Sequence, residues 1–329
     1  MNKKLLLIIG FCFLIISCQN TLLPASRYPK TINGIRAAWK QCEPKAGVNV
    51  FSNEPKTIAP YKTGSLTNGF LKDGLNTLNF VRYLAGLPEV ELHKAYNNEC
   101  QAGALVMAVN KTLSHYPAKP AGMDNGLYKT GYDACGSSNI ASGYSTLDAT
   151  VIGYCNDSDA GNIDRVGHRR WILNPRMAKT GFGFVTSNSF YSAMKSFDSS
   201  GSEKRDYVLW PSKGFFPDKF FGPSQAWSVS LDSGKYSNAA AHRAGISVQL
   251  TCLNNASTWI FTSADTNKYG KYFNIDTGGY GMNFCIIFRP DNLTSILSTN
   301  KFKVEINGLK DRLGNAMDKI EYEVEFFKL

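Results

Sequence analysis

The chain has 329 residues, of which 43% are hydrophobic and 19% charged, a composition that indicates a globular protein of about two domains and excludes a disordered or fibrous one. The formal net charge is +10, but Lys and Arg form no long run, which argues against a nucleic-acid partner. Outside the first 17 residues no apolar run reaches the roughly 18–20 residues of a bilayer span, which excludes a polytopic membrane protein.

The N-terminus has the pattern of an export signal. Lys3 and Lys4 precede the apolar segment 5–16, which is too short to span a bilayer and is typical of a signal peptide. The segment ends in Ile-Ile-Ser-Cys18, which resembles the lipobox of bacterial lipoproteins. This resemblance implies that Cys18 is diacylated and becomes the mature N-terminus, since one acyl chain alone binds a membrane only marginally.

We therefore predict a lipoprotein signal peptide over 1–17, a tether over 18–33 and membrane attachment through Cys18. Ordinary secretion with cleavage nearby is the alternative. The predicted location is the bacterial cell envelope, outside the cytoplasm. Because residue 19 is Gln rather than Asp, the outer membrane is favoured if the source has two membranes.

Apolar periodicity predicts three helices in the next part of the chain. A spacing of three and four residues runs over 75–85 and stops at Gly86 and Pro88. A second helix is predicted over about 91–110. The third is predicted over 145–155, because Ser-x-x-Asp at its start has the pattern of a capping box.

After residue 175 the apolar spacing changes to alternation, for example at Phe182 and Phe184, which predicts strands. Helices followed by strands indicate an α+β or layered domain over about 34–198. The polar, Ser- and Gly-containing segment 199–206 is predicted to be a linker.

The remaining segment, 207–329, is dominated by strand signals. Alternating apolar residues separated by turn residues recur at 227–231, 246–250, 284–288, 302–306 and 320–326. This spacing indicates an antiparallel β-sandwich of immunoglobulin-like type. An aromatic segment at 210–221 opens this domain, and we interpret it as packing between the domains, with a sugar- or peptide-binding patch as the alternative.

Six cysteines remain after the two in the export segment, and an even number in an exported chain makes disulfides plausible. Six cysteines allow 15 pairings. The favoured pairs are Cys252–Cys285, Cys135–Cys155 and Cys42–Cys100. Buried free thiols or another pairing are the alternative. No Cys-x-x-Cys occurs, which argues against a zinc ribbon or a thioredoxin-type site.

Two of the four histidines lie in conspicuous segments, Leu-Ser-His115 and Gly-His168-Arg-Arg-Trp-Ile-Leu-Asn-Pro. The segments around them are Asn79-x-x-Arg82, Gly136-Ser-Ser-Asn-Ile140 and Gly181-Phe-Gly183. In order and spacing, these five segments resemble the CAP superfamily of cysteine-rich secretory proteins, antigen 5 and pathogenesis-related proteins (SCP-like domains). The resemblance covers about residues 75–195.

The resemblance implies a three-layer α-β-α sandwich with an open cleft lined by two histidines and two acidic residues. His115 and His168 match the histidine positions. Ser138 stands where the family has the glutamate of a Gly-Glu-Asn motif, and Asp157 falls near the second acidic position. The missing glutamate argues against an acid–base mechanism that depends on it.

Two imidazoles and a carboxylate could hold a divalent metal, most naturally Zn²⁺, so His115, His168 and Asp157 are the candidate ligands. The alternative is that the histidines only fix the shape of the cleft through hydrogen bonds. A nucleophilic serine, Ser114 or Ser138, lacks the Gly-x-Ser-x-Gly elbow of serine hydrolases.

Arg165, Arg169 and Arg170 flank the second histidine. Arginine forms bidentate pairs with phosphate and carboxylate, so anion binding is one interpretation of the three. The other is that they anchor the loop through Asp164 or Asp157. Trp171 is predicted to lie in the core.

We therefore expect a surface-anchored, non-enzymatic module that binds a lipid, a sterol, or a host or envelope molecule in the histidine cleft. The alternative is a metal-assisted or serine hydrolase of peptides or envelope polymers. Its candidate catalytic residues are His115, His168, Asp157 and Ser138.

Overall fold

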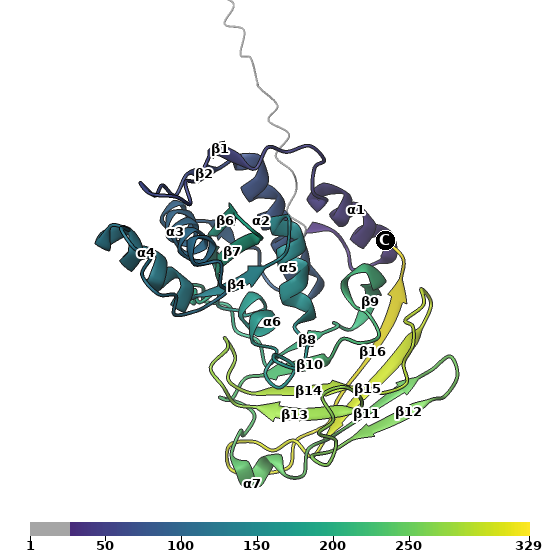
Figure 1. Cartoon of the computed structure of the whole chain (residues 1–329). Coiled ribbons are helices and arrows are strands. Elements are labelled where there is room, and N and C mark those ends of the chain that lie inside the picture. The colour runs from purple at the N-terminus through teal and green to yellow at the C-terminus, as the bar shows by residue number, and fades with distance from the viewer. Residues whose placement is uncertain (1–26) are drawn as a thin grey trace, which may run out of the picture.

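The computed structural model describes residues 27–329 (Figure 1). The predicted signal peptide, Cys18 and most of the predicted tether lie outside the described residues. Within 27–329, no helix is both long enough and apolar enough to cross a bilayer.

The helices are α1 (Ile32–Cys42), α2 (Asn68–Leu84), α3 (Lys94–Asn110), α4 (Asn125–Gly136), α5 (Leu147–Asn156), α6 (Gly167–Ile172), α7 (Ala240–Arg243) and the 3₁₀ helix η2 (Asp218–Phe220). The three helices predicted from periodicity are confirmed as α2, α3 and α5. The capping position of α5 is shifted by one residue, because Thr146 rather than Ser145 accepts the hydrogen bond from a first-turn amide, that of Ala149, at 3.3 Å.

The first half of the molecule is a three-layer sandwich around a small antiparallel sheet. The sheet has the order β4-β7-β6, and its strands are β4 (Ser138–Ser142), β7 (Phe190–Lys195) and β6 (Phe182–Thr186). Side chains alternate across it: Phe182 and Phe184 pack towards α2 and α5, while Val185 packs towards α3 and α4. The expected α-β-α architecture is therefore confirmed (Figure 1).

Short strand pairs complete this half. They are β1 (Phe51–Asn53) with β2 (Ser65–Leu66), and β3 (Glu91–Leu92) with β5 (Lys179–Thr180). The second pair is parallel and ties the start of α3 to the entrance of β6.

The second half contains two sheets. One has the order β13-β14-β10-β8, with strands β13 (Tyr272–Asp276), β14 (Cys285–Arg289), β10 (Trp227–Leu231) and β8 (Tyr207–Trp210). The other has the order β12-β11-β15-β16-β9, with strands β12 (Thr258–Phe261), β11 (Ser247–Cys252), β15 (Lys301–Asn307), β16 (Ile320–Phe327) and β9 (Gly214–Pro217).

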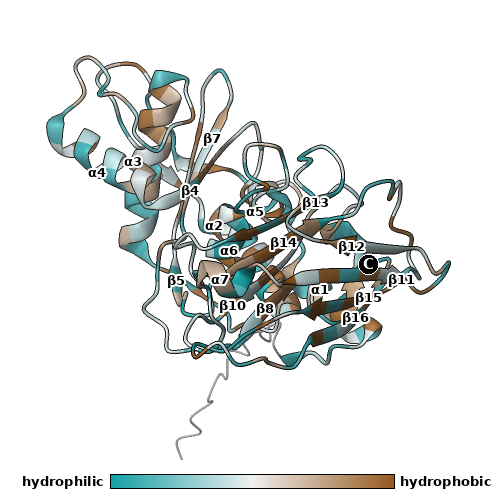
Figure 2. Ribbon diagram, turned by 90° about the horizontal axis from the view of Figure 1, so that it is seen from below, coloured by the Kyte–Doolittle hydropathy of each residue, from teal (hydrophilic) through white to brown (hydrophobic). Residues whose placement is uncertain are grey.

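Aromatic side chains from the two sheets meet between them. The ring of Trp227 lies 5.7 Å from that of Phe302, and the ring of Phe261 lies 5.3 Å from that of Phe288. Figure 2 shows hydrophilic and hydrophobic residues alternating along β15 and β16, as expected for strands with one face in a core. The β-sandwich prediction holds, except that β9 pairs with β16 in parallel.

One continuous hydrophobic cluster joins the two halves. Trp39 of α1 contacts Phe80 of α2 at 4.9 Å between ring centroids, and it contacts Phe220 of the second half at 5.4 Å. Phe220 and Phe221 are about 1% exposed, so the aromatic segment packs between the halves as expected and presents no binding patch. The domain boundaries themselves stay a prediction.

The six cysteines in the described range are free and buried, which corrects the predicted pairs Cys252–Cys285, Cys135–Cys155 and Cys42–Cys100. Each predicted pair would have to cross a sheet. Cys100 and Cys135 lie in the cluster under α3 and α4, whereas Cys42 and Cys155 lie in the core on the opposite face. Cys252 points into the β-sandwich, and Cys285 points out of it.

Candidate functional site

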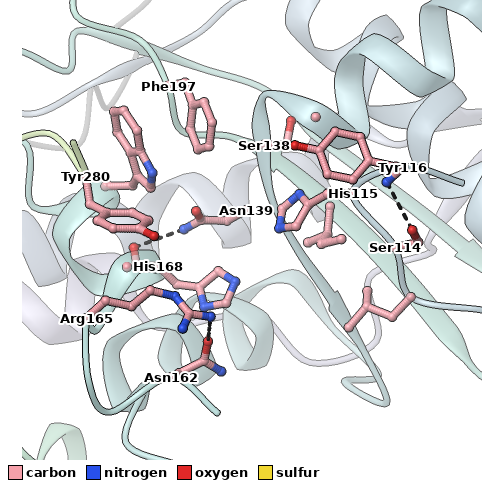
Figure 3. A pocket seen from close by; sticks show the side chains of 15 residues that line it. Ser114, His115, Tyr116, Ser138, Asn139, Asn162, Arg165, His168, Phe197 and Tyr280 are labelled. Carbon is pink, nitrogen blue, oxygen red and sulfur yellow. Dashed lines mark hydrogen bonds between the residues drawn. The ribbon is translucent and has the colours of Figure 1, made fainter. Parts of the chain in front are cut away.

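A cleft of about 620 Å³ contains both candidate histidines (Figure 3). His115 comes from the loop before α4, Ser138 and Asn139 from the start of β4, and His168 from the start of α6. Tyr280 of the second half lines the same cleft. The two histidines predicted from the family resemblance are thus brought together.

The imidazole of His168 is held from behind by Asp157. The Nδ1–H of His168 donates to one carboxylate oxygen of Asp157 at 2.8 Å, because a carboxylate can only accept. The other oxygen accepts the backbone N–H groups of His168 at 2.8 Å and Arg169 at 3.3 Å. The ring of Tyr154 stacks on the imidazole at 5.3 Å, and burial raises the pKa of its hydroxyl well above the ordinary value, so Tyr154 is neutral.

His115 is held in the same way by a backbone carbonyl. Its Nδ1–H donates to the carbonyl oxygen of Cys135 at 2.7 Å. Both rings therefore carry the proton on Nδ1 and turn Nε2 to the cleft. In the described part of the chain, no hydrogen-bond partner meets Nε2 of either ring.

The three-ligand metal site predicted from His115, His168 and Asp157 does not form. The side chain of Asp157 is 1% exposed and lies behind the imidazole of His168, with both oxygens engaged. Among residues 27–329, no group of three His, Cys, Asp or Glu side chains is placed to hold a metal ion. The donor set offers two imidazoles only, which does not fit the three or four protein ligands typical of zinc.

Ser138 does not take the place of the missing glutamate. The residue is fully buried, and its hydroxyl lies 3.6 Å from the thiol of Cys100. Ser114 accepts a hydrogen bond from the backbone N–H of Tyr116 at 3.0 Å. Neither serine bonds to an imidazole in the described structure, so no serine–histidine pair is formed.

Two of the three arginines beside His168 join the halves of the molecule instead of binding an anion. Arg169 is fully buried and donates to the carbonyl oxygens of Cys155 and Ala226, each at 2.6 Å. Burial lowers its pKa to about 10, so the guanidinium stays charged at neutral pH. Arg170 pairs with Asp276. Of the three arginines, only Arg165 lines the cleft.

The other motif residues near the cleft are structural. Arg82 is fully buried and donates to the carbonyl oxygens of Pro88, Ile172, Asn174 and Met177. The side-chain amide of Asn79 bonds to both backbone groups of Val90 at 2.8 and 3.0 Å. These contacts fasten the chain after α6 to α2, and thereby fix the position of His168.

Sequence reasoning missed the aromatic wall of the cleft. Trp171, which we expected in the core, lines the cleft and stacks on Phe197 at 4.1 Å between ring centroids. Tyr280 lies edge-on to Trp171 at 6.5 Å. Figure 3 shows Phe197 and Tyr280 lining the same cleft as the two imidazoles. No local pattern points to Tyr280, since it approaches from more than 100 residues away.

Comparison with known proteins identifies a family that matches the part of the chain that contains both histidines of the cleft. Residues 75–197 match the model of the cysteine-rich secretory protein family, CAP. Among curated proteins, no sequence matches the chain. One solved structure with some similarity is the N-terminal part of the bacterial S-layer protein SbsC, at 12% identity and a TM-score of 0.20 over 31% of this chain and 20% of that one. With the α-β-α layers and the histidine cleft both present, residues 75–197 are a CAP domain.

Proposed function

We propose that the protein is a lipid-anchored ligand-binding module of the bacterial cell envelope. Its CAP cleft would bind a lipid, a sterol, or a host or envelope molecule. One observation carries the proposal: two rigidly held imidazoles present unpaired Nε2 atoms to a cleft of about 620 Å³. Such a cleft has the size of a small-molecule site and converging polar groups.

The geometry favours binding over hydrolysis. A general base must lie within hydrogen-bond reach of the group that it deprotonates, and neither Ser114 nor Ser138 reaches an imidazole. Asp157 orients His168 but is shielded from the cleft by it. A hydrolase acting through Ser138, or through a metal held by His115, His168 and Asp157, is therefore disfavoured.

The anchoring part of the proposal depends on the lipobox-like sequence. Cys18 lies nine residues before the first described residue, and an extended chain of that length reaches at most roughly 30 Å. Acylation of Cys18 would keep residue 27 within this distance of the membrane surface. Metabolic labelling with palmitate tests this: the wild-type chain should be labelled and Cys18→Ser should not.

A panel titration tests the binding function. Tryptophan fluorescence would follow phospholipid vesicles, a sterol dispersion, cell-wall glycan fragments and peptides added to the wild type and to the His115→Ala/His168→Ala variant. We expect at least one class to bind the wild type about 10-fold more tightly than the variant, since truncating central polar contacts typically costs more than 1 kcal/mol.

The same samples separate binding from catalysis. Product would be measured by mass spectrometry after prolonged incubation. Turnover that disappears in His168→Ala would favour the hydrolase alternative. Equal affinities of the wild type and the double variant for every bound class would contradict a role of the cleft.

A further inference from the structure

We propose that Tyr280, together with Trp171 and Phe197, forms a subsite of the CAP cleft that stacks against the ring of an acidic sugar, and that Arg165 pairs with the carboxylate of that sugar. This inference rests on the proposed ligand-binding function and names its ligand class. It also assigns a role to the second half of the molecule, because Tyr280 lies outside the CAP domain, in the connection between β13 and β14.

Close packing fixes the ring of Tyr280 at the mouth of the cleft. A Cβ atom at residue 167 would lie 2.9 Å from two carbons of this ring, so the glycine before His168 allows the tyrosine to approach. Gly281, with φ of +81°, turns the chain directly after it in a backbone conformation that favours glycine. The ring therefore lies directly against the start of α6.

Arg170 holds the connection that carries Tyr280. Its guanidinium donates to the carbonyl oxygens of Gly278 at 2.7 Å and Met282 at 2.6 Å, on either side of the tyrosine. The same group lies 5.0 Å from the centroid of the Tyr280 ring. Because Arg170 is only 2% exposed, these contacts are shielded from water. The aromatic wall is thus preorganised across the two halves.

The wall has the character of a stacking platform. Phe197 stays 37% exposed although it stacks on Trp171, so apolar ring surface remains open to a ligand. A pyranose ring presents an apolar C–H face and a polar rim. Aromatic side chains offer a matching combination of large apolar area and low conformational entropy. An acyl chain would instead be expected to require an enclosed apolar channel, whereas this cleft is open to solvent.

The charges in the cleft favour an acidic ligand. Arg165 lines it, and among residues 27–329 no aspartate or glutamate is part of its lining. The side chain of Arg165 is 39% exposed and donates to the side-chain oxygen of Asn162 at 3.1 Å. Its ion pair with Asp164 spans 3.5 Å, which is a weak surface contact. Asp164 has a closer partner in Lys268 at 3.0 Å. A ligand carboxylate could therefore replace Asp164 on the guanidinium with better geometry.

Calorimetric titration of the purified chain tests the inference with three probes: digalacturonic acid, a neutral galactose disaccharide and decanoate. We expect digalacturonic acid to bind at least about 10-fold more tightly than the neutral disaccharide. Tyr280→Ala should weaken binding of the acidic probe about 10-fold, and Tyr280→Phe, which keeps the ring, should restore it. Arg165→Gln should remove the preference for the acidic probe.

Matched substitutions outside the cleft serve as controls. Tyr269→Ala removes a tyrosine that is 88% exposed, and Arg312→Gln removes an arginine with no ion pair in the described structure. Both should bind digalacturonic acid like the wild type. Equal binding of acidic and neutral sugars, or unchanged binding in Tyr280→Ala, would overturn the inference. Binding of decanoate alone would also overturn the inference, but the cleft would remain a ligand-binding site. If no class of the wider panel binds, the proposed function itself is overturned.

Discussion

Substituting alanine for Gly183 is expected to destabilise the CAP domain by about 3 kcal/mol, the upper end of the usual cost of overpacking. A Cβ atom at this position would lie 2.0 Å from the carbonyl oxygen of Cys100 and 2.4 Å from the backbone nitrogen of Gln101. Both atoms belong to the main chain of α3, which cannot move aside without separating from β6 and β7. The clash therefore cannot be relieved without disturbing the packing of α3 on the sheet.

Urea denaturation followed by circular dichroism would measure the loss as a lower transition midpoint. Gly222→Ala is the matched control, because no atom of the described residues lies within 4 Å of a Cβ atom at residue 222 and its φ is not positive. This control should stay within about 0.5 kcal/mol of the wild type. A midpoint for Gly183→Ala equal to that of Gly222→Ala would contradict the close approach of α3 to β6.

The same contact explains part of the family motif. At Gly181 a Cβ atom would lie 2.4 Å from the backbone of α3 at Tyr96 and Asn97. Between the two glycines, Phe182 points to the opposite face of the sheet, into the core under α2. The two glycines of Gly-Phe-Gly thus allow α3 to lie directly on β6. The motif has a structural role and does not line the cleft.

Local patterns were sufficient to predict the secondary structure of both halves. The spacing of apolar residues depends on the helix or strand period alone, so α2, α3 and α5 and the main strands of the sandwich could be predicted without knowing what they contact. The cleft histidines could be placed only through the family resemblance, because 53 residues separate His115 from His168 and no spacing rule connects them.

Side-chain parity, which was available in the sequence, already argued against one disulfide. Ile286 and Phe288 of β14, and Phe284 just before it, face the sandwich core, so Cys285 must face the other way. Cys252 shares the inward face of β11 with Val248. The predicted pair Cys252–Cys285 is therefore wrong, because the first thiol faces the sandwich core and the second faces away from it.

Contacts between the halves could not be predicted from the sequence. Arg169, Arg170 and Tyr280 meet partners that lie 57 to 112 residues away along the chain. An arginine pair next to a cleft histidine looks the same in sequence whether it binds an anion or carries a domain interface. The burial of the arginine side chains distinguishes anion binding from a role in the domain interface, and this burial depends on the whole fold.

The second large expected effect concerns this interface. Arg169→Met should lower the free energy of unfolding by about 3–5 kcal/mol, because it removes a buried charge whose hydrogen bonds have no substitute. In addition to Cys155 and Ala226, the guanidinium donates to the carbonyl oxygen of Asn156 at 2.6 Å and to the hydroxyl of Ser228 at 3.1 Å. Methionine fills much of the same volume but removes the guanidinium donor from the buried carbonyl groups of Cys155 and Ala226.

Arg205→Met is the matched control, because its side chain is about half exposed and its ion pair with Glu203, at 2.8 Å, lies at the surface. It should cost less than about 1 kcal/mol. Differential scanning calorimetry separates the possible outcomes. Since Arg169 links the end of α5 to β10, its loss should lower Tm. A single transition at the wild-type Tm would show that the guanidinium is not needed to join them.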